Sequence, residues 1–255
     1  MTEVRSTPSK SPEERLEEVK SLVFELGTVR IDQLAADFGV SEMTIRRDLD
    51  ELEVLGLAHR IRGGAVAVGP EPWDRRRMHN ADAKMTIAHK LLDVVPRVGA
   101  VAFDASTTIF RLASVVERVD DLTVVTNGWD TFHAIHRRPG VSASVTGGSQ
   151  ERRTGSLVGP VAVRAAESFL YDAFLCSAAG LDVGLGASEA ALAETEVKRA
   201  FARTSQRVIL GLDHAKLGSR AQARVFDFDD IDLLVTDLDP KDRLLDPYRD
   251  LVEIL

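Results

Sequence analysis

The sequence predicts an α/β protein with two domains, a small helical N-terminal domain and a larger domain built on a mainly parallel sheet. Three observations support this prediction. The 255 residues exceed the size of a common single domain. The rhythm of apolar residues changes near residue 70. Beyond Lys84, segments with helical spacing alternate with short apolar runs, as in a chain whose strands are joined by crossover helices.

The composition is that of an ordinary soluble globular protein, 44% hydrophobic and 28% charged. No apolar run is long enough to cross a membrane and the polar N-terminus has no apolar signal core, so we expect a cytoplasmic protein without a membrane partner. The net charge of -8 disfavours nucleic-acid binding by bulk attraction, although a small basic face can still dock. Cys176, the only cysteine, lies in an apolar run that favours burial over nucleophilic chemistry.

The N-terminal part has the pattern of three short helices. Residues 1–12 are rich in Ser, Pro and Thr and are expected to be disordered, and the first domain is expected over residues 13–69. Apolar residues recur at helical spacing over 13–26 and again over 31–38, and each segment is followed by a glycine. Ser41 suits the N-cap of a third helix. This order outlines a helix-turn-helix.

The third helix is predicted to carry a basic face toward DNA. Ile45, Leu49, Leu52 and Leu55 repeat at intervals of three or four residues and must face the core. Arg46 and Arg47 then lie on another face, in the half of the helix that enters the major groove in such domains. For each arginine alone, a solvated surface charge is the alternative. The acidic residues further along the helix are expected to point away from the DNA or to keep the helix soluble.

A β-hairpin is predicted after this helix. The segment LAHRIRGGAV alternates apolar and polar residues around a Gly-Gly turn, and it would carry His59 and two arginines toward the DNA backbone. The predicted DNA-binding residues are Ser41, Met43, Thr44, Arg46, Arg47, Arg60 and Arg62.

Residues 40–66, VSEMTIRRDLDELEVLGLAHRIRGGAV, resemble the signature of the DeoR family of bacterial transcriptional regulators. That resemblance implies a winged helix-turn-helix with a TIRRDL core and a wing ending in GGA. Two positions depart from it. Arg30 stands where relatives often have a Ser or Thr cap, and Thr44 lacks the acidic side chain of a capping box. Neither departure touches the proposed DNA-binding face.

Residues 70–83 are interpreted as a linker, because Pro70 and Pro72 interrupt any helix there. The basic run Arg75, Arg76 and Arg77 favours a solvated tether over an auxiliary phosphate contact. The second domain is expected over residues 84–255. Within it, the pattern predicts helices over 84–95, 106–117, 129–137, 160–169 and 189–205, and strands over 100–105, 122–127, 141–148, 172–180, 207–213 and 232–237.

Polar residues gather where these strands end. DASTT, residues 104–108, places an acid and three hydroxyls between a strand and a helix, where amides and hydroxyls can converge on an anion such as phosphate. TNG and TGG end the next two strands, and two lysines and an aspartate further along can add contacts. The predicted effector-binding residues are Asp104, Ser106, Thr107, Thr108, Asn127, Gly128, Gly147, Gly148, Lys198, Asp213 and Lys216.

The order KMTIA, DASTT, VVTNG, TGG, SLVGP, AAGLD, EVKRA, LDHAK and LLVTD, from Lys84 to Asp237, again resembles the DeoR family, here its effector-sensing domain. The resemblance implies the fold shared by ribose-5-phosphate isomerase, glucosamine-6-phosphate deaminase and CoA transferases. It also implies a phosphorylated sugar or related metabolite as ligand. Relatives usually have glycine in place of Ser106, so this position is expected to reshape the site.

The sequence thus predicts a DNA-binding regulator, acting as a repressor of carbohydrate metabolism genes, that self-associates as a dimer or tetramer. It is expected to bind promoter DNA and a phosphorylated effector, and to need no cofactor or metal. His133 and His136 have no third ligand nearby in sequence. Two alternatives remain open: a sugar-phosphate isomerase that uses Asp104, Asp182 or Asp213 as its base, and a constitutive DNA-binding protein whose second domain only drives assembly.

Overall fold

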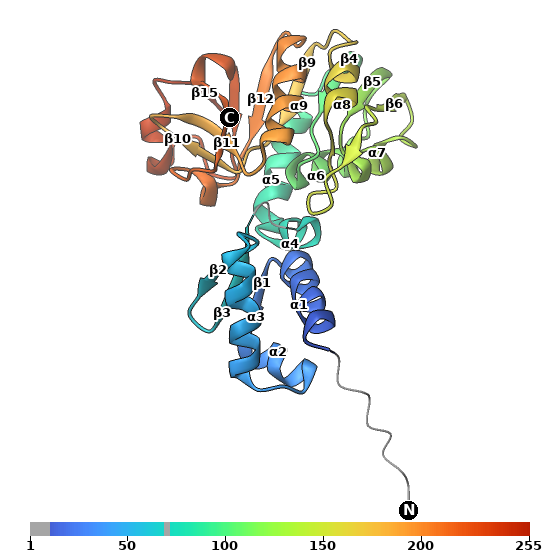
Figure 1. Ribbon diagram of the computed structural model, residues 1–255. Helices are drawn as coiled ribbons and strands as arrows, with labels where there is room; N and C mark the ends of the chain where they lie inside the picture. The colour runs from blue at the N-terminus through green and yellow to red at the C-terminus, as the bar shows by residue number, and fades with distance from the viewer. Residues whose placement is uncertain (1–10, 69–71) are drawn as a thin grey trace, which may run out of the picture. The chain divides into compact units, whose positions relative to one another are not determined.

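The computed structural model describes residues 11–68 and 72–255, and the chain divides into two compact units, Met1–Arg75 and Arg76–Leu255 (Figure 1). Most of the tail predicted to be disordered, residues 1–10, lies outside the described residues. Its last two residues belong to the first helix instead. Ser11 and Glu14 form a capping box and Pro12 takes the first helical position, a start signal that the sequence prediction overlooked.

The first unit is a helical bundle closed by a small antiparallel sheet. Its elements are α1 Pro12–Leu26, β1 Thr28–Arg30, α2 Ile31–Phe38, α3 Glu42–Val54, β2 Ala58–Ile61 and β3 Gly64–Ala67. Gly27 and Gly39 end α1 and α2 with positive φ, as the sequence predicted. The core consists of apolar residues from all three helices and the sheet, including Val19, Leu34, Ile45, Leu49, Leu52 and Ala65. Leu55, predicted to face this core, is instead 59% exposed, because α3 ends before it and Leu55 is the C-cap.

The β-hairpin forms with a different turn from the one predicted. Ile61 pairs with Gly64, so the turn residues are Arg62 and Gly63, and Gly63 has a φ of 82°. Gly64 lies within β3 and faces β1, where an added Cβ atom would stand 2.0 Å from the Val29 carbonyl oxygen. The second glycine therefore permits strand pairing. The sequence prediction missed β1 because three residues carry no periodic signal.

The segment predicted to be a linker contains helical structure. Helix α4, Trp73–Met78, spans the boundary between the two units, and α5 begins at Ala81, before the predicted start at Lys84. Residues 69–71, which include Pro70, lie outside the described residues. Pro72 directly precedes α4, and a proline is tolerated at the start of a helix.

The second unit is built on a seven-stranded parallel sheet with the order β15-β14-β12-β9-β4-β5-β6. This sheet confirms the predicted α/β class. Its strands are β4 Val98–Phe103, β5 Asp121–Thr126, β6 Val141–Val145, β9 Ala173–Cys176, β12 Val208–Gly211, β14 Leu233–Val235 and β15 Glu253–Ile254. Its helices are α5 Ala81–Leu92, α6 Thr107–Val115, α7 Trp129–Ile135, α8 Pro160–Ala166 and α9 Leu192–Arg203.

Alternate residues of the strands enter two separate cores. Val101 and Phe103 point into the core that also contains buried residues of α5, α6 and α7. Ala102 and Cys176 point into the core filled by α8 and α9. Burial, together with the Asp104 carboxylate, raises the pKa of the Cys176 thiol well above its ordinary value, which suits a packed side chain. Both faces of the sheet are covered, as expected for parallel strands.

Smaller elements lie outside the main sheet. The antiparallel sheet β10-β11-β13 contains β10 Gly180–Asp182, β11 Gly186–Glu189 and β13 Ala223–Phe226, and β7 Ser149–Gln150 pairs with β8 Leu157–Val158. Glu189, predicted to start a helix, instead ends β11, and α9 starts at Leu192. Short 3-10 helices cover His214–Lys216, Phe228–Asp230 and Arg243–Tyr248. Within the described part of the chain, no helix has the length and apolar character that a membrane crossing requires.

Candidate functional site

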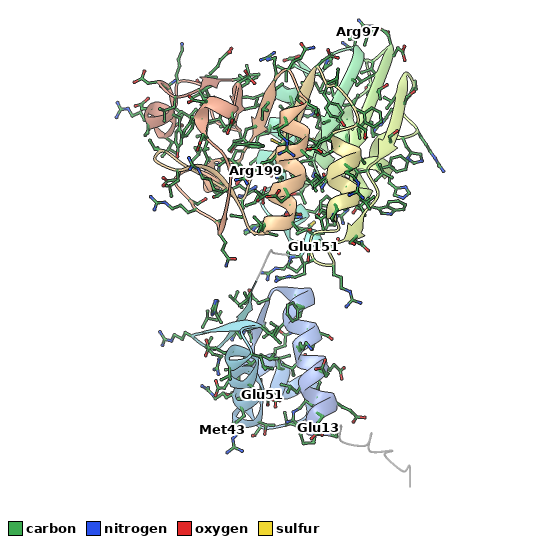
Figure 2. The ribbon with its side chains drawn as sticks, turned by 45° about the horizontal axis from the view of Figure 1, so that its top comes forward. Glu13, Met43, Glu51, Arg97, Glu151 and Arg199 are labelled. Carbon is green, nitrogen blue, oxygen red and sulfur yellow. The ribbon has the colours of Figure 1, made fainter. Side chains whose placement is uncertain are left out.

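The start of α3 presents an exposed basic face in the first unit. Ser41 caps the helix by accepting the Thr44 N–H at 3.2 Å, and the two hydroxyl oxygens lie 2.9 Å apart. Met43 is 60% exposed, and Arg46 and Arg47 are exposed as well. Figure 2 labels Met43 near the start of α3 and Glu51 further along the same helix. A polar and cationic helix start of this kind can enter a DNA groove.

The acidic residue after the arginines holds the helix in place. Asp48 is buried, and its carboxylate accepts two hydrogen bonds from the Arg15 guanidinium of α1, at 2.7 and 3.1 Å. The hydrogen bond to Asp48 is the main cause that raises the pKa of Arg15. Such bidentate pairs fix geometry as well as adding energy. The pair therefore sets the angle between α1 and α3.

Arg60 has partners that the sequence did not predict. Its guanidinium donates to the Asp50 carboxylate, to the Arg46 carbonyl at 3.2 Å and to the Gly64 carbonyl at 3.2 Å. The side chain is 21% exposed. Arg60 thus joins the hairpin to the middle of α3. Arg62, at the turn of the hairpin, remains exposed.

In the second unit, the carboxyl ends of the parallel strands meet at one edge of the sheet. From β4 the chain proceeds outward through β5 and β6, whereas β9, β12, β14 and β15 proceed outward on the other side. The direction therefore reverses between β4 and β9. Open parallel sheets bind ligands beyond the carboxyl ends of the strands at such a switch point. Asp104 follows β4 and Ser177 follows β9 at this position.

Asp104 is the centre of a buried polar network. One carboxylate oxygen accepts the Ser106 N–H at 2.9 Å, and the other accepts the Ser177 N–H at 2.9 Å and the Lys198 ammonium at 2.9 Å. The Lys198 ammonium also donates to the Ser177 carbonyl at 2.5 Å and to the Glu189 carboxylate. These three acceptors match the three N–H donors of a lysine.

The protonation of this network follows from burial and charge. Burial alone lowers the pKa of Lys198, but the Asp104 and Glu189 carboxylates outweigh it and raise that pKa. Burial raises the pKa of Glu189 despite the opposing charge of Lys198. The lysine is therefore a permanent cation that holds β9, β11 and the loop after β4 together.

The loop after β4 leads into α6 without strain at Ser106. This residue has a φ of -76°, and its hydroxyl caps α6 by accepting the Ile109 N–H at 3.2 Å. The backbone here does not require glycine, because a serine adopts this φ freely. The next two residues, Thr107 and Thr108, are buried in the first turn of α6.

The loop after β5 lies against the loop after β4. An added Cβ atom on Gly128 would stand 2.9 Å from the Ala105 Cα atom, and the Thr131 hydroxyl donates to the Asp104 carbonyl at 3.4 Å. Asn127 is buried, and its amide nitrogen donates to the Leu157 carbonyl at 3.2 Å. The predicted residues at the ends of β4 and β5 are thus brought together.

Three neutral buried oxygens at this edge have no hydrogen-bond partner among the described residues, besides the charged Asp213 Oδ2, which lies 3.5 Å from the Lys216 ammonium. They are the Thr108 hydroxyl, the side-chain carbonyl of Asn127 and the Ser177 hydroxyl. Each residue is at most 2% exposed. An unsatisfied buried polar atom costs about 1–3 kcal/mol, so three near one switch point indicate a place built for polar ligand atoms or water.

The remaining predicted residues lie around this centre. Gly147 and Gly148 follow the edge strand β6, and an added Cβ atom on Gly148 would stand 2.6 Å from the Val158 carbonyl oxygen, so this glycine serves close packing. Lys216 donates to the Ala178 carbonyl at 2.9 Å and lies 3.5 Å from Asp213. Burial lowers the pKa of Lys216.

Sequence reasoning missed several polar partners. Glu189 was placed in a helix, and Ser177 was read as part of an apolar strand. The Ser156 hydroxyl donates to the Glu194 carboxylate at 2.7 Å, and both side chains are buried. The sequence gives no hydrogen-bond partner for Ser156 of the SLVGP motif, because only the fold brings α9 beside it.

The sequence of the chain matches two domains of one known protein family. Residues 15–71 match the DeoR-like helix-turn-helix domain, and residues 79–238 match the DeoR C terminal sensor domain. The HTH-type transcriptional regulator GolR of Listeria innocua is 30% identical over 89% of this chain and 91% of its own length. The HTH-type transcriptional regulator GlpR of Haloferax volcanii is 32% identical over 89% and 90%. The glycerol-3-phosphate regulon repressor of Escherichia coli is 28% identical over 86% and 88%.

Solved structures overlap only weakly. Ribose 5 phosphate isomerase A from Neisseria gonorrhoeae gives a TM-score of 0.37 at 15% identity over 54% of this chain and 53% of that chain. The sorbitol operon regulator SorC from Klebsiella pneumoniae gives 0.36 at 11% identity over 80% and 89%.

Proposed function

Because the chain belongs to the DeoR family of DNA-binding transcriptional regulators, we propose that a phosphorylated sugar or related metabolite binds its second unit and controls its hold on promoter DNA. The relatives' names support this assignment. One is a glycerol-3-phosphate regulon repressor, and another is a putative aga operon transcriptional repressor. Repression that the ligand relieves is the proposed direction of control.

The observation that carries the effector proposal is the group of three unpartnered oxygens around the switch point. The start of α6 adds N–H groups at the same place, and helix N-termini attract anions because their first amides lack intrahelical partners. A ligand with a phosphate and several hydroxyls would satisfy both features. Asp104 and Lys198, whose bonds are already used within the protein, would support the site without touching the ligand.

Binding without turnover fits the acids at this edge better than catalysis. A general base must reach the proton it removes. Asp104 is fully buried with both oxygens bonded. The hydrogen bond from Arg220 lowers the pKa of Asp182, which weakens it as a base. Asp213 is fully buried, with one oxygen accepting the Asn80 amide at 2.7 Å and the other lying 3.5 Å from the Lys216 ammonium, without a hydrogen bond. We therefore favour a sensor over an isomerase.

We further propose that the chain self-associates. One winged unit offers few base contacts, and specific control of a promoter usually needs two units on two half-sites. A ligand that binds one arrangement of the subunits more tightly than another would shift the population toward that arrangement. The paired units would then no longer match the spacing of the half-sites.

The double variant Thr107→Ala/Thr108→Ala tests the effector site. We expect it to lose the ligand response, because both hydroxyls lie at the start of α6, where the phosphate of the ligand is proposed to bind. The measurement is the shift of the unfolding temperature with a panel of sugar phosphates. For the native chain, a ligand at a hundred times its Kd adds about 2.7 kcal/mol of stability.

Thr86→Ala is the matched control, since its hydroxyl donates to the Asp82 carbonyl within α5. It should keep the full ligand response. An unchanged response in the Thr107/Thr108 double variant would move the site away from α6.

Arg60 and Arg62 are expected to act differently on DNA. Arg60→Ala should weaken operator binding by loosening the hairpin from α3, without changing the slope of log K against log salt concentration. Arg62→Ala should lower that slope by about 0.9, the value for one lost phosphate contact. The affinity and the slope are both measured by operator titrations at several salt concentrations. If both variants lowered the slope equally, Arg60 would also contact a DNA phosphate directly.

A further inference from the structure

Helix α4 is the covalent connection between the two units, and its C-terminal end is fastened to the second unit by side chains. The last carbonyls of a helix have no partner within the helix and carry partial negative charge. In α4 these carbonyls and the residues just after them receive bonds from α5 and α6. We call residues 76–80 the docking segment.

Lys84 and Arg111 supply cations to this end of α4. The buried Lys84 ammonium donates to the Arg76 carbonyl at 2.5 Å and to the His79 carbonyl at 2.7 Å. The Arg111 guanidinium donates to the Arg77 carbonyl at 3.2 Å. Charge-assisted bonds of this kind are about twice as strong as neutral ones. They anchor the docking segment whether or not a ligand is present.

Two further bonds come from residues at the carboxyl edge of the sheet. The Thr107 hydroxyl donates to the Arg76 carbonyl at 3.4 Å, and the Asp213 carboxylate accepts the Asn80 amide at 2.7 Å. Asn80 has a φ of 50°, a left-handed conformation that few residues other than glycine adopt. The Asn80–Asp213 bond therefore holds a residue whose backbone conformation costs energy.

The Thr107 bond is the one that a ligand would take. A hydroxyl has one proton to donate, and at 3.4 Å its bond to a neutral carbonyl is long and weak. An anionic oxygen placed at the start of α6 offers that proton a shorter, charge-assisted bond. The proton cannot serve both acceptors, so ligand binding removes one fastening of α4.

We propose that the docking segment couples the two units: an anionic ligand at the start of α6 takes the Thr107 proton from the Arg76 carbonyl and loosens α4. This inference rests on the proposed effector site and adds the route by which occupancy reaches the connection to the DNA-binding unit. Helix α4 begins at Trp73 in the first unit and ends in the second. Loosening of its C-terminal end therefore acts on the covalent connection to the first unit.

The run Arg75, Arg76 and Arg77 provides a direct assay, because trypsin cuts after arginine where the backbone opens. Thr107→Val removes the hydroxyl and keeps the shape of the side chain. Asn80→Gly removes the bond to Asp213 and permits the same positive φ. We expect both variants, in the full chain without ligand, to be cut in this run several-fold faster than the native protein. Thr86→Ala, which loses a hydroxyl-to-carbonyl bond elsewhere on α5, should match the native rate.

The same experiment also measures the operator affinity of both variants and the effect of inorganic phosphate on the cleavage rate. We expect both variants to bind operator DNA several-fold more weakly, and phosphate to speed cleavage of the native chain but not of Thr107→Val. The coupling proposal would be overturned if both variants had the same cleavage rate, operator affinity and unfolding temperature as the native protein. A phosphate-induced rise in unfolding temperature without faster cleavage would also overturn it, leaving the effector site standing. Fast cleavage in both variants without any phosphate binding would support the coupling and count against the phosphate site.

Discussion

Replacing Arg46 and Arg47 together by alanine is expected to lower operator affinity roughly a hundredfold or more, because each base or phosphate contact by arginine is worth about 1–3 kcal/mol. Both side chains are exposed on the half of α3 that follows the Ser41 cap. Arg46 makes a single exposed ion pair with Glu42 at 3.3 Å, and such pairs contribute little to stability. The unfolding temperature should therefore stay the same.

The measurement is a titration of fluorescent operator DNA, with random-sequence DNA beside it. Glu51→Ala is the matched control, since Glu51 is exposed on the same helix beyond the proposed contact surface (Figure 2). It should bind as well as the native chain or slightly better, because a negative charge is lost. Native operator affinity in the double arginine variant would show that another surface reads the DNA.

Lys198→Met is expected to lower the free energy of unfolding by about 3–5 kcal/mol, the usual cost of removing one partner from a buried ion pair. The variant would leave the Asp104 and Glu189 carboxylates buried beside each other without a cation. It would also leave the Ser177 carbonyl without the Lys198 bond. Urea unfolding monitored by far-UV circular dichroism gives this quantity.

Two controls separate charge from packing in this variant. Glu196→Ala, on the exposed side of α9, should be nearly neutral. Adding Asp104→Asn and Glu189→Gln to Lys198→Met removes both stranded charges and should recover part of the loss. A loss below about 1 kcal/mol for Lys198→Met alone, within the range of exposed surface pairs, would mean that the buried network is not a structural centre.

The sequence predicts the order of elements in both units well, because long periodic segments carry their own signal. The helices over 13–26 and 31–38 and the strands that became β4, β5 and β6 appear close to their predicted places. The prediction fails for short or non-local structure. β1, the hairpin β7-β8 and the sheet β10-β11-β13 have two to four residues per strand and are defined by their partners.

The candidate site could be predicted as a set of strand ends but not as a network. The motif DASTT indicates an anion site from local chemistry alone. The roles within it depend on residues far along the chain: Asp104 meets Ser177 and Lys198, and Thr107 meets Arg76. Arg76 was assigned to a solvated tether because nothing in its neighbourhood marks the end of a docked helix.

The roles of the acidic residues that follow the two arginines of α3 also depend on partners far along the chain. The sequence predicts that they keep the helix soluble or point away from DNA. In the structure Asp48 binds Arg15 of α1, and Asp50 accepts the Arg60 guanidinium of the hairpin. Both acids therefore fix the recognition helix against its neighbours, so that its arginines are presented in one orientation.

Operator binding in the presence of candidate effectors tests directly whether the chain is a phosphate-sensing regulator. Operator DNA is selected from a random pool by the full chain, and its affinity is then measured with sugar phosphates and with the same sugars lacking phosphate. We expect at least one phosphorylated compound to weaken operator binding while its unphosphorylated parent does not. Operator affinity that no member of the panel changes, or that the parent sugars change equally, would contradict a phosphate-sensing regulator.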